Sequence, residues 1–431
     1  MAGWRKIAVA GLASACAWFP VGHAAAGSFG VREQSASAQG ASYAGVAAGG
    51  QLSSMFWNPA VMTQFGGISA ESSTTGFIGE AHNYPSGGTL SALPYASDDI
   101  LKDALIPAMY ASMQWRPDLW LGVSVNSPFG LSVTFPDMWP GRNYGLSTSL
   151  KTYNVTPSIA YRFNDWLSVG VGVQVEYGTI NQDAGLTPVP PTTLNFHGAG
   201  WGVGATAGVT LTPGPNTTIG IGWRSGINQE FNGSLSTPLP GGTPGSASTT
   251  LKLPDIVSAG IRQRMNERLT LLGTVEWTNW SRIGTATIYQ PSGAPALVTA
   301  GAPVANALEY RDGWLFSGGV EYQWLPNLTL RAGAGYEISP VTDAVRVPSI
   351  PDANRTWVSG GLTWAISPKV KVDLAYSHLF VDEATIAIEP GHPSYNGSVT
   401  YFGTAKGQID LISVGLKYQF APPPAPLHSR G

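Results

Sequence analysis

LISVGLKYQF, residues 411–420, alternates from Ile412 onward between apolar side chains and polar or small ones. In an extended chain the even-numbered residues, from Ile412 to Phe420, form an apolar face, and the odd-numbered residues, from Ser413 to Gln419, form a polar one. An apolar face suits lipid and a polar face suits a lumen, so the segment has the pattern of a transmembrane β-barrel strand. The segments SVGVGVQVEY (168–177) and KVKVDLAY (369–376) repeat this pattern.

The same pattern, followed along the whole chain, predicts about fourteen strands, an even number within the range of single-chain bacterial barrels. The fold class is therefore all-β transmembrane, an antiparallel outer-membrane β-barrel over residues 68–420. The predicted strands cover residues 68–83, 106–115, 120–135, 146–163, 167–181, 197–213, 217–232, 249–265, 269–289, 308–324, 328–340, 356–367, 370–388 and 401–420.

The connections between these strands alternate in length. Short turns such as RPDL (116–119) and FNDW (163–166) follow the even-numbered strands, and long Pro-, Gly- and Ser-rich loops follow the odd-numbered ones. Short periplasmic turns and long outer loops are the outer-membrane arrangement, so both ends of the barrel are expected in the periplasm. Tryptophans flank several short turns, as an interfacial girdle requires: Trp115, Trp120, Trp166 and Trp324.

Composition agrees with a membrane barrel. Only 11% of the residues are charged, whereas roughly 25% is usual for globular proteins. A soluble β-sandwich, the main alternative, would need more surface charge. Acidic residues (26) outnumber Lys and Arg (23), so a nucleic-acid partner is not expected.

The N-terminus predicts export. Arg5 and Lys6 precede an apolar run over residues 7–19, followed by three alanines, which is the pattern of a secretory signal peptide over residues 1–26. The run is too short for a spanning helix, which needs roughly 20 residues. The only cysteine, Cys16, lies in this segment, so the mature chain has no thiol for a disulfide or a metal site.

Residues 27–67 do not fit the strand pattern. The stretch SASAQGASYAGVAAGG (35–50) is small and weakly helical, and a segment dangling in the periplasm would expose Met55, Phe56 and Trp57 to water. We therefore expect an N-terminal hatch that plugs the barrel. These three side chains are candidates for lining a ligand pocket, with plain packing between hatch and barrel as the alternative.

A rigid corner follows them at Asn58, Pro59 and Ala60. Pro59 fixes its own φ and disfavours helical geometry at Asn58, so the corner can hold the hatch against the barrel wall near the third strand. At the other end of the chain, APPPAPLHSRG (421–431) predicts a Pro-rich extended tail in the periplasm.

An ordered set of motifs carries a family resemblance. It comprises GSFGVREQSASAQGASYAGVA (27–47) leading to NPA (58–60), NSPFGL (126–131), TTIGIGWRSGI (217–227), LKLPDIVSAGI (251–261), YRDGW (310–314), LRAGAGYEISPV (330–341) and DLAYSHLF (373–380). The set resembles the FadL-type outer-membrane transporters for long-chain fatty acids and other hydrophobic compounds. The resemblance implies a fourteen-stranded barrel with a hatch, ligand capture at outer loops, an internal pocket and lateral release through a gap at the third strand.

The third strand has a physical reason to open. Pro128 cannot donate to the strand ladder and Gly130 weakens pairing, so the predicted gap comprises Ser127, Pro128, Phe129 and Gly130. Pro157 on the fourth strand can widen the same point. The alternative is that both prolines sit at a strand rim.

The resemblance also bears on the ligand. The fatty-acid transporters carry a basic residue before an Asp where this chain has Arg311, so Arg311 resembles a headgroup ligand. They carry a second basic residue on the fifth strand, where this chain offers Thr179. The missing cation leaves a neutral ligand, such as a monoaromatic hydrocarbon, as the alternative substrate.

No catalytic, cofactor or metal motif is found. The mature histidines are not in nucleophile or metal spacing, and the G-x-S-x-G elbow is absent. A general porin would need an open, charged constriction, whereas this chain has a predicted plug. An outer-membrane hydrolase would need a set of nucleophile and base residues, which the sequence does not show. We expect a non-enzymatic, monomeric channel for hydrophobic molecules in the outer membrane of a Gram-negative bacterium. Its other partners are membrane lipid, lipopolysaccharide and the barrel assembly machinery.

Overall fold

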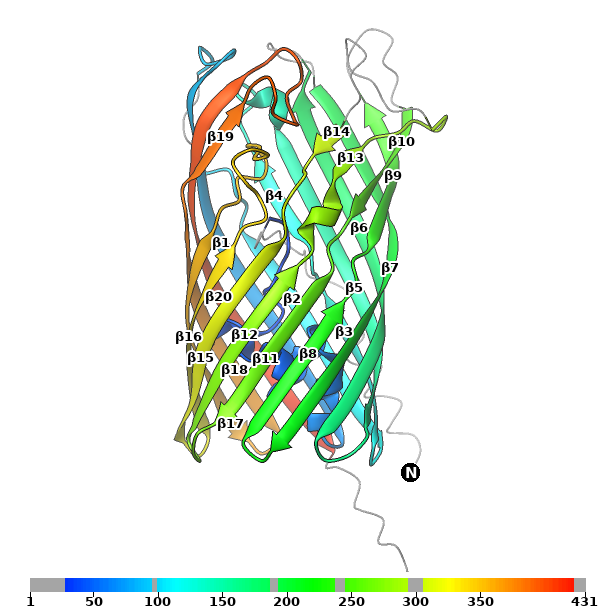
Figure 1. The fold of residues 1–431 in the computed structure, drawn as a ribbon, viewed down its shortest axis with the longest axis vertical. Coiled ribbons are helices and arrows are strands. Elements are labelled where there is room, and N and C mark those ends of the chain that lie inside the picture. The colour runs from blue at the N-terminus through cyan, green and yellow to red at the C-terminus, as the bar shows by residue number, and fades with distance from the viewer. Residues whose placement is uncertain (1–27, 95–98, 187–192, 237–244, 294–304, 422–431) are drawn as a thin grey trace, which may run out of the picture.

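The computed structural model describes residues 28–94, 99–186, 193–236, 245–293 and 305–421. Its strands form a tall barrel, and short helical turns near the N-terminus lie inside its lower half (Figure 1). The predicted signal peptide, and all of the predicted tail except Ala421, lie outside the described residues.

Eighteen strand segments within the described residues form one sheet. Their bounds are β1 Ile68–Gly88, β2 Ala104–Arg116, β3 Leu119–Asn126, β4 Gly130–Thr134, β5 Ser147–Arg162, β6 Leu167–Gly185, β7 Thr193–Gly214, β8 Thr217–Arg224, β9 Asn228–Ser236, β10 Gly245–Lys252, β11 Ile256–Arg264, β12 Leu269–Thr278, β15 Gly313–Leu325, β16 Leu328–Ile338, β17 Arg355–Ser367, β18 Val370–Val381, β19 Ala384–Ile388 and β20 Tyr401–Ala421.

The sheet closes on itself. β1 pairs with β20 in antiparallel register, from Ile68 opposite Ala421 to Gly88 opposite Tyr401. Interruptions divide four wall strands into the pairs β3/β4, β8/β9, β10/β11 and β18/β19, so the described segments make a closed 14-stranded antiparallel barrel. The predicted fold class is confirmed. Closure leaves no unpaired sheet edge to meet lipid.

The two faces of each strand follow the sequence pattern. On β20 the outward side chains of Ile412 and Val414 are each 51% exposed, whereas the inward Ser413 is fully buried. On β6 the outward Val173 is 51% exposed and the inward Glu176 is buried. The alternation in the sequence therefore predicted correctly which of these side chains face the lipid and which face the lumen.

One predicted strand, residues 269–289, is shorter in the structure. β12 ends at Thr278, and the chain turns through the short helix η5 (Trp280–Ile283) before the small β13 (Thr285–Thr287), which pairs with β14 (Ala305–Ala307). Trp280 and Ile283 are buried in an apolar cluster of the lumen. Burial of these two side chains stabilises the turn, because removing aromatic and aliphatic surface from water lowers the free energy.

The N-terminal residues 28–67, here called the hatch, run through the lumen as short turns. These are α2 (Ala36–Gln39), η1 (Val46–Ala48), η2 (Leu52–Phe56) and η3 (Pro59–Gln64). Nearly every side chain between Ser28 and Thr63 is buried. No helix in the described part of the chain is long and apolar enough to cross a membrane.

Candidate functional site

The lumen on the loop side of the hatch contains one cluster of buried apolar side chains. Four aromatic rings meet at its base and are called the aromatic box: Phe29 of the hatch, Phe129, Trp280 and Tyr310. The Trp280 ring stands edge-on to Phe29 at 4.7 Å, to Phe129 at 6.2 Å and to Tyr310 at 6.3 Å between centroids. Such edge-to-face contacts favour a defined aromatic arrangement. The lumen here suits an apolar solute better than a column of water.

A cavity lies next to Phe129 and Trp280 of the aromatic box, and the charged side chains of Arg32, Glu276 and Glu337 also line it. Phe56 and Trp57 of the hatch line it, together with Pro128 and Phe129 of the third wall strand. The structure thus brings two of the predicted ligand residues and two of the predicted gap residues to one cavity. Their roles in binding and release remain predictions.

The third wall strand is interrupted at this cavity. β3 ends at Asn126 and β4 begins at Gly130, and only β3 pairs with β2, up to Val125 opposite Met109. Both segments pair with β5, β3 as far as Asn126 opposite Asn154 and β4 from Gly130 opposite Lys151. Residues 127–129 therefore interrupt the ladder on both sides, and within the described residues β4 has no ladder with β2. The predicted weak point of the wall is therefore present as a break in strand pairing.

The hatch covers this break with its own polar groups. Val31 N donates to Pro128 O at 2.8 Å, and the Gln34 side chain donates to Ser127 O at 2.9 Å. Gly30 and Phe129 form an antiparallel bridge. Hatch residues 30–34 thus form hydrogen bonds with the backbone groups that β2 leaves unpaired. These bonds stabilise the break, because a buried carbonyl without a hydrogen bond costs free energy.

A charged cluster fixes the same part of the hatch. Arg32 Nη2 lies 2.7 Å from Glu276 Oε1 on β12, and Arg32 Nη1 lies 3.1 Å from Glu337 Oε1 on β16. Ser258 donates to Glu276 at 2.6 Å, and the Trp357 indole donates to Glu337 at 3.0 Å. We call Arg32, Glu276 and Glu337 the clamp. Burial disfavours the charged guanidinium, but the two carboxylates outweigh it and raise the pKa of Arg32.

Glu33 stands next to the clamp with no side-chain hydrogen-bond partner. Its side chain is fully buried, and within the described residues its carboxyl group interacts by hydrogen bond with its own backbone amide alone. Burial raises the pKa of Glu33 to about 7, although Arg32 and Arg355 act in the opposite direction. The hatch therefore holds an acidic group that is neutral below pH 7 and strained electrostatically above it.

The lower hatch lies directly on glycines of the wall. A Cβ at Gly220 would overlap Ala47 O, one at Gly222 would overlap Trp57 O, and one at Gly333 would overlap the Ala41 backbone. Only glycine permits such close backbone approach. Wall glycines of this kind, called the glycine belt, are Gly170, Gly208, Gly220, Gly222, Gly333 and Gly361.

The predicted corner is found at the end of the hatch. Asn58 is extended (φ −149°, ψ 105°), its side chain accepts from Ala60 N, and Pro59 begins η3. The Asn58 amide also donates to Ala47 O at 2.8 Å and to Val209 O on β7 at 2.9 Å. The Asn58 amide thus bonds to the wall backbone at β7, whereas the groups of the third strand at the break are bonded by Val31 and Gln34.

Met55 and Arg311 are placed differently from Phe56 and Trp57. Met55 is buried against the wall near Gly122 of β3, where it packs between hatch and barrel. Arg311 is exposed, and its Nε donates to Ser339 O at 3.1 Å. Neither residue lines the cavity next to the aromatic box. Their predicted ligand roles are not supported by this cavity and stay predictions.

Several residues of the site were not predicted from sequence. Arg32, Phe29 and Trp280 have no motif of their own and gain their meaning only from distant partners. The inward strand phase of Glu276 was a usable signal, because an inward carboxylate needs a cation. No set of three or more His, Cys, Asp or Glu side chains in the described ranges is arranged to hold a metal ion.

A closed barrel with outward apolar faces, an apolar lumen and an N-terminal segment inside it is typical of an outer-membrane transport protein. A family model described as outer membrane protein transport protein (OMPP1/FadL/TodX) matches residues 18–420. The chain belongs to this family, and it is an outer-membrane protein of a Gram-negative bacterium.

Curated relatives have similar length. A long-chain fatty acid transport protein of Escherichia coli K12 is 27% identical over 426 residues, which cover 87% of this chain and 93% of that protein. Outer membrane protein P1 of Haemophilus influenzae is 26% identical over 461 residues, which cover 93% and 96%.

Solved structures share the fold. A Pseudomonas aeruginosa FadL homologue superposes with a TM-score of 0.82 at 21% identity, covering 91% of this chain and all of that one. The Ralstonia pickettii toluene transporter TbuX superposes with a TM-score of 0.64 at 17% identity, covering 91% and 99%. At these identities the likeness concerns the fold.

Proposed function

We propose that this protein is a non-enzymatic channel that takes up long-chain fatty acids across the outer membrane without energy coupling. The observation that carries the proposal is the buried apolar cluster of the lumen, which runs from the aromatic box to the loop-side strands and ends on the hatch. Burial of an acyl chain there is favoured by about 25 cal/mol per Å² of apolar surface. The names and lengths of the curated relatives support the fatty-acid assignment.

The path follows the order of these features. A ligand is captured among the outer loops, enters the apolar cluster and reaches the cavity lined by Phe56, Trp57 and Phe129. Binding there competes with the contacts that hold hatch residues 30–34. When these contacts yield, the break between β2 and β4 opens to the side, and the ligand leaves through it. A ligand shifts the hatch only by its differential affinity for the two states.

The surroundings of the barrel follow from its class. We propose that it acts as a monomer within outer-membrane lipid and lipopolysaccharide, after insertion by the barrel assembly machinery.

A monoaromatic hydrocarbon is the second candidate substrate. The aromatic box favours it, because its edge-on rings offer faces and edges to a small aromatic ring. Solved relatives with this fold include toluene transporters.

Uptake by whole cells separates the candidates. A transporter-null Gram-negative host that expresses this protein is expected to take up radiolabelled oleate, and an empty-vector host is not. Entry of labelled toluene without oleate would contradict the fatty-acid assignment. Free passage of small sugars through the protein in liposomes would contradict the plugged channel itself.

A further inference from the structure

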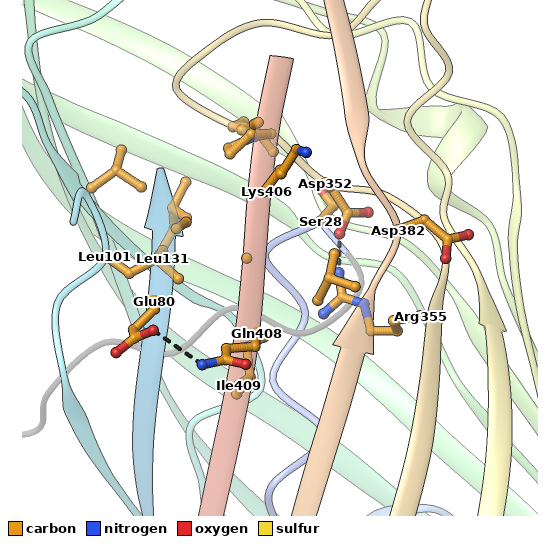
Figure 2. A pocket seen from close by; sticks show the side chains of 17 residues that line it. Ser28, Glu80, Leu101, Leu131, Asp352, Arg355, Asp382, Lys406, Gln408 and Ile409 are labelled. Carbon is orange, nitrogen blue, oxygen red and sulfur yellow. Dashed lines mark hydrogen bonds and ion pairs between the residues drawn. The ribbon is translucent and has the colours of Figure 1, made fainter. Parts of the chain in front are cut away.

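A second cavity lies in the loop-side half of the barrel, behind β1 and β20. Its apolar wall is formed by strand and loop residues, and its outer rim by polar groups that include those of β1 and β20 (Figure 2). The apolar lining residues include Leu101, Leu131, Val133, Ile350, Val381 and Ile409. This cavity does not include Arg311, Phe56 or Trp57.

The polar end of this cavity holds Arg355 and Ser28. Arg355 lies at the start of β17, is 3% exposed, and forms an ion pair with Asp352 through its Nη2. Ser28 belongs to the first described turn of the hatch and is 2% exposed. Figure 2 shows Ser28, Asp352 and Arg355 close to one another beside β20.

Donor groups at this end lack acceptors. Arg355 Nε is buried without a hydrogen bond, and its ion-pair contact with Glu337 Oε2 is long, at 3.9 Å. The buried hydroxyls of Ser28 and Tyr310 interact with each other, and neither has another hydrogen-bond partner within the described residues, so one of the two O–H donors is left without an acceptor. Both carboxylate oxygens of Asp352 are already engaged, one by Arg355 and the other by Ser339. A buried donor without an acceptor is costly, so the site is built to receive one.

The required acceptor is small and sits at the end of an apolar cavity. A carboxylate has two oxygens and about four lone-pair positions, which match several converging donors. A hydrocarbon has no acceptor and would leave all of them unsatisfied. The rim supplies no better anion site, since Lys406 is exposed and already pairs with Glu383 at 3.0 Å.

We propose that Arg355 Nε and Ser28 Oγ form the headgroup site for the carboxylate of a single-chain fatty acid, with its acyl chain along Leu101, Leu131 and Ile409. The site supplies a cation in place of the basic residue that the fatty-acid transporters carry on the fifth strand, where this chain has Thr179. This inference rests on the proposed uptake of fatty acids and names the residues that recognise the head. Because Ser28 belongs to the hatch, an occupied site also links the ligand to the hatch.

Binding to the purified full-length protein in nanodiscs tests the site by comparing oleate with methyl oleate. The wild-type protein is expected to bind oleate about 10- to 100-fold more tightly than the ester, the range for hydrogen bonds to charged groups. The double variant R355M/D352N removes the charge together with its ion-pair partner, and the ratio is expected to fall to about one. Ser28→Ala loses one neutral donor, so a fall of about 2- to 10-fold is expected.

Matched controls separate this site from general damage. Arg331→Met removes another buried, ion-paired arginine, on β16 and outside this cavity, and should leave the ratio unchanged. A heat-dependent gel shift of each variant checks that the barrel is folded. If R355M/D352N does not fold, Ser28→Ala and the wild-type ratio still decide.

Three results would overturn the headgroup site. These are a wild-type ratio of about one, an unchanged ratio in both variants, or a ratio abolished by Arg311→Gln instead. Failure of this site is distinguishable from failure of the proposed function, because oleate uptake by cells is measured separately. If cells take up oleate but the variants leave the oleate-to-ester affinity ratio unchanged, only the headgroup site is contradicted. If cells take up no oleate, the proposed function is contradicted.

Discussion

We expect Glu33 to make the docking of hatch residues 28–34 depend on pH. Its buried carboxyl has a pKa of about 7 in the docked hatch, against 4.5 for an unperturbed glutamate. Between these pH values the docked form keeps a proton that the released form has lost. Docking therefore weakens as pH rises from 4.5 to 7 and stays at the weaker level above that range.

The size of the effect follows from the shift. One pKa unit corresponds to about 1.4 kcal/mol, so the docked hatch loses about 3 kcal/mol, or roughly 300-fold in its docking equilibrium. Glu33→Gln cannot ionise, and its docking is expected to be independent of pH. The charged neighbours that remain around position 33 are Arg32, Glu337 and Arg355.

Hydrogen exchange of backbone amides in residues 28–40 measures docking directly. After correction for the intrinsic chemical rate, protection in the wild-type protein should fall from pH 5 to pH 8 and stay constant in Glu33→Gln. Glu80→Gln, which removes an exposed carboxylate on the outer face of β1, is the matched control and should behave as wild type. Protection that does not change with pH in the wild type, or changes equally in Glu33→Gln, would refute the reasoning.

Three further substitutions test the seating of the hatch. Gly220→Ala should displace the lower hatch and increase conductance in planar bilayers, because its Cβ would overlap Ala47 O. The control Gly318→Ala meets nothing within 4 Å and should conduct as wild type. Equal conductance of the two variants would contradict the role of the glycine belt. Arg32→Met leaves the buried Glu276 and Glu337 without their shared cation, a change that costs about 3–5 kcal/mol, and faster exchange at residues 30–34 should follow. Replacing Asn58, Pro59 and Ala60 by glycine removes the amide contacts to Ala47 and Val209 and should reduce oleate uptake while the barrel keeps its gel shift; full uptake would remove the corner's role.

The wall of the barrel was readable from sequence for a simple reason. Alternation has a period of two residues, and each strand satisfies it locally, as residues 411–420 show without reference to any partner. The break at Pro128 was readable as well, because the missing N–H of proline is a property of one residue.

The clamp and the headgroup site were not readable, because they join residues that are far apart in the chain. Arg32 is 244 positions from Glu276 and 305 from Glu337. Strand phase shows that Glu276 points inward, but it does not give the rotation of the hatch that brings Arg32 to it. The same holds for Ser28 and Arg355, which meet only after the hatch has folded into the closed barrel.

The two halves of the hatch are held by different physics, and this difference decides which half can move. The lower half rests backbone to backbone on the glycine belt, where any displacement opens voids along many contacts and meets a close-packed wall. Residues 28–34 are held instead by a few hydrogen bonds at the third-strand break and by the clamp, beside a Glu33 that has no side-chain hydrogen-bond partner. A ligand that supplies an acceptor near Ser28 and apolar surface near Phe29 competes only with this second set. The proposed lateral release therefore requires the upper hatch to yield while the lower hatch stays in place, and we expect the channel to open sideways at the wall without becoming an open pore.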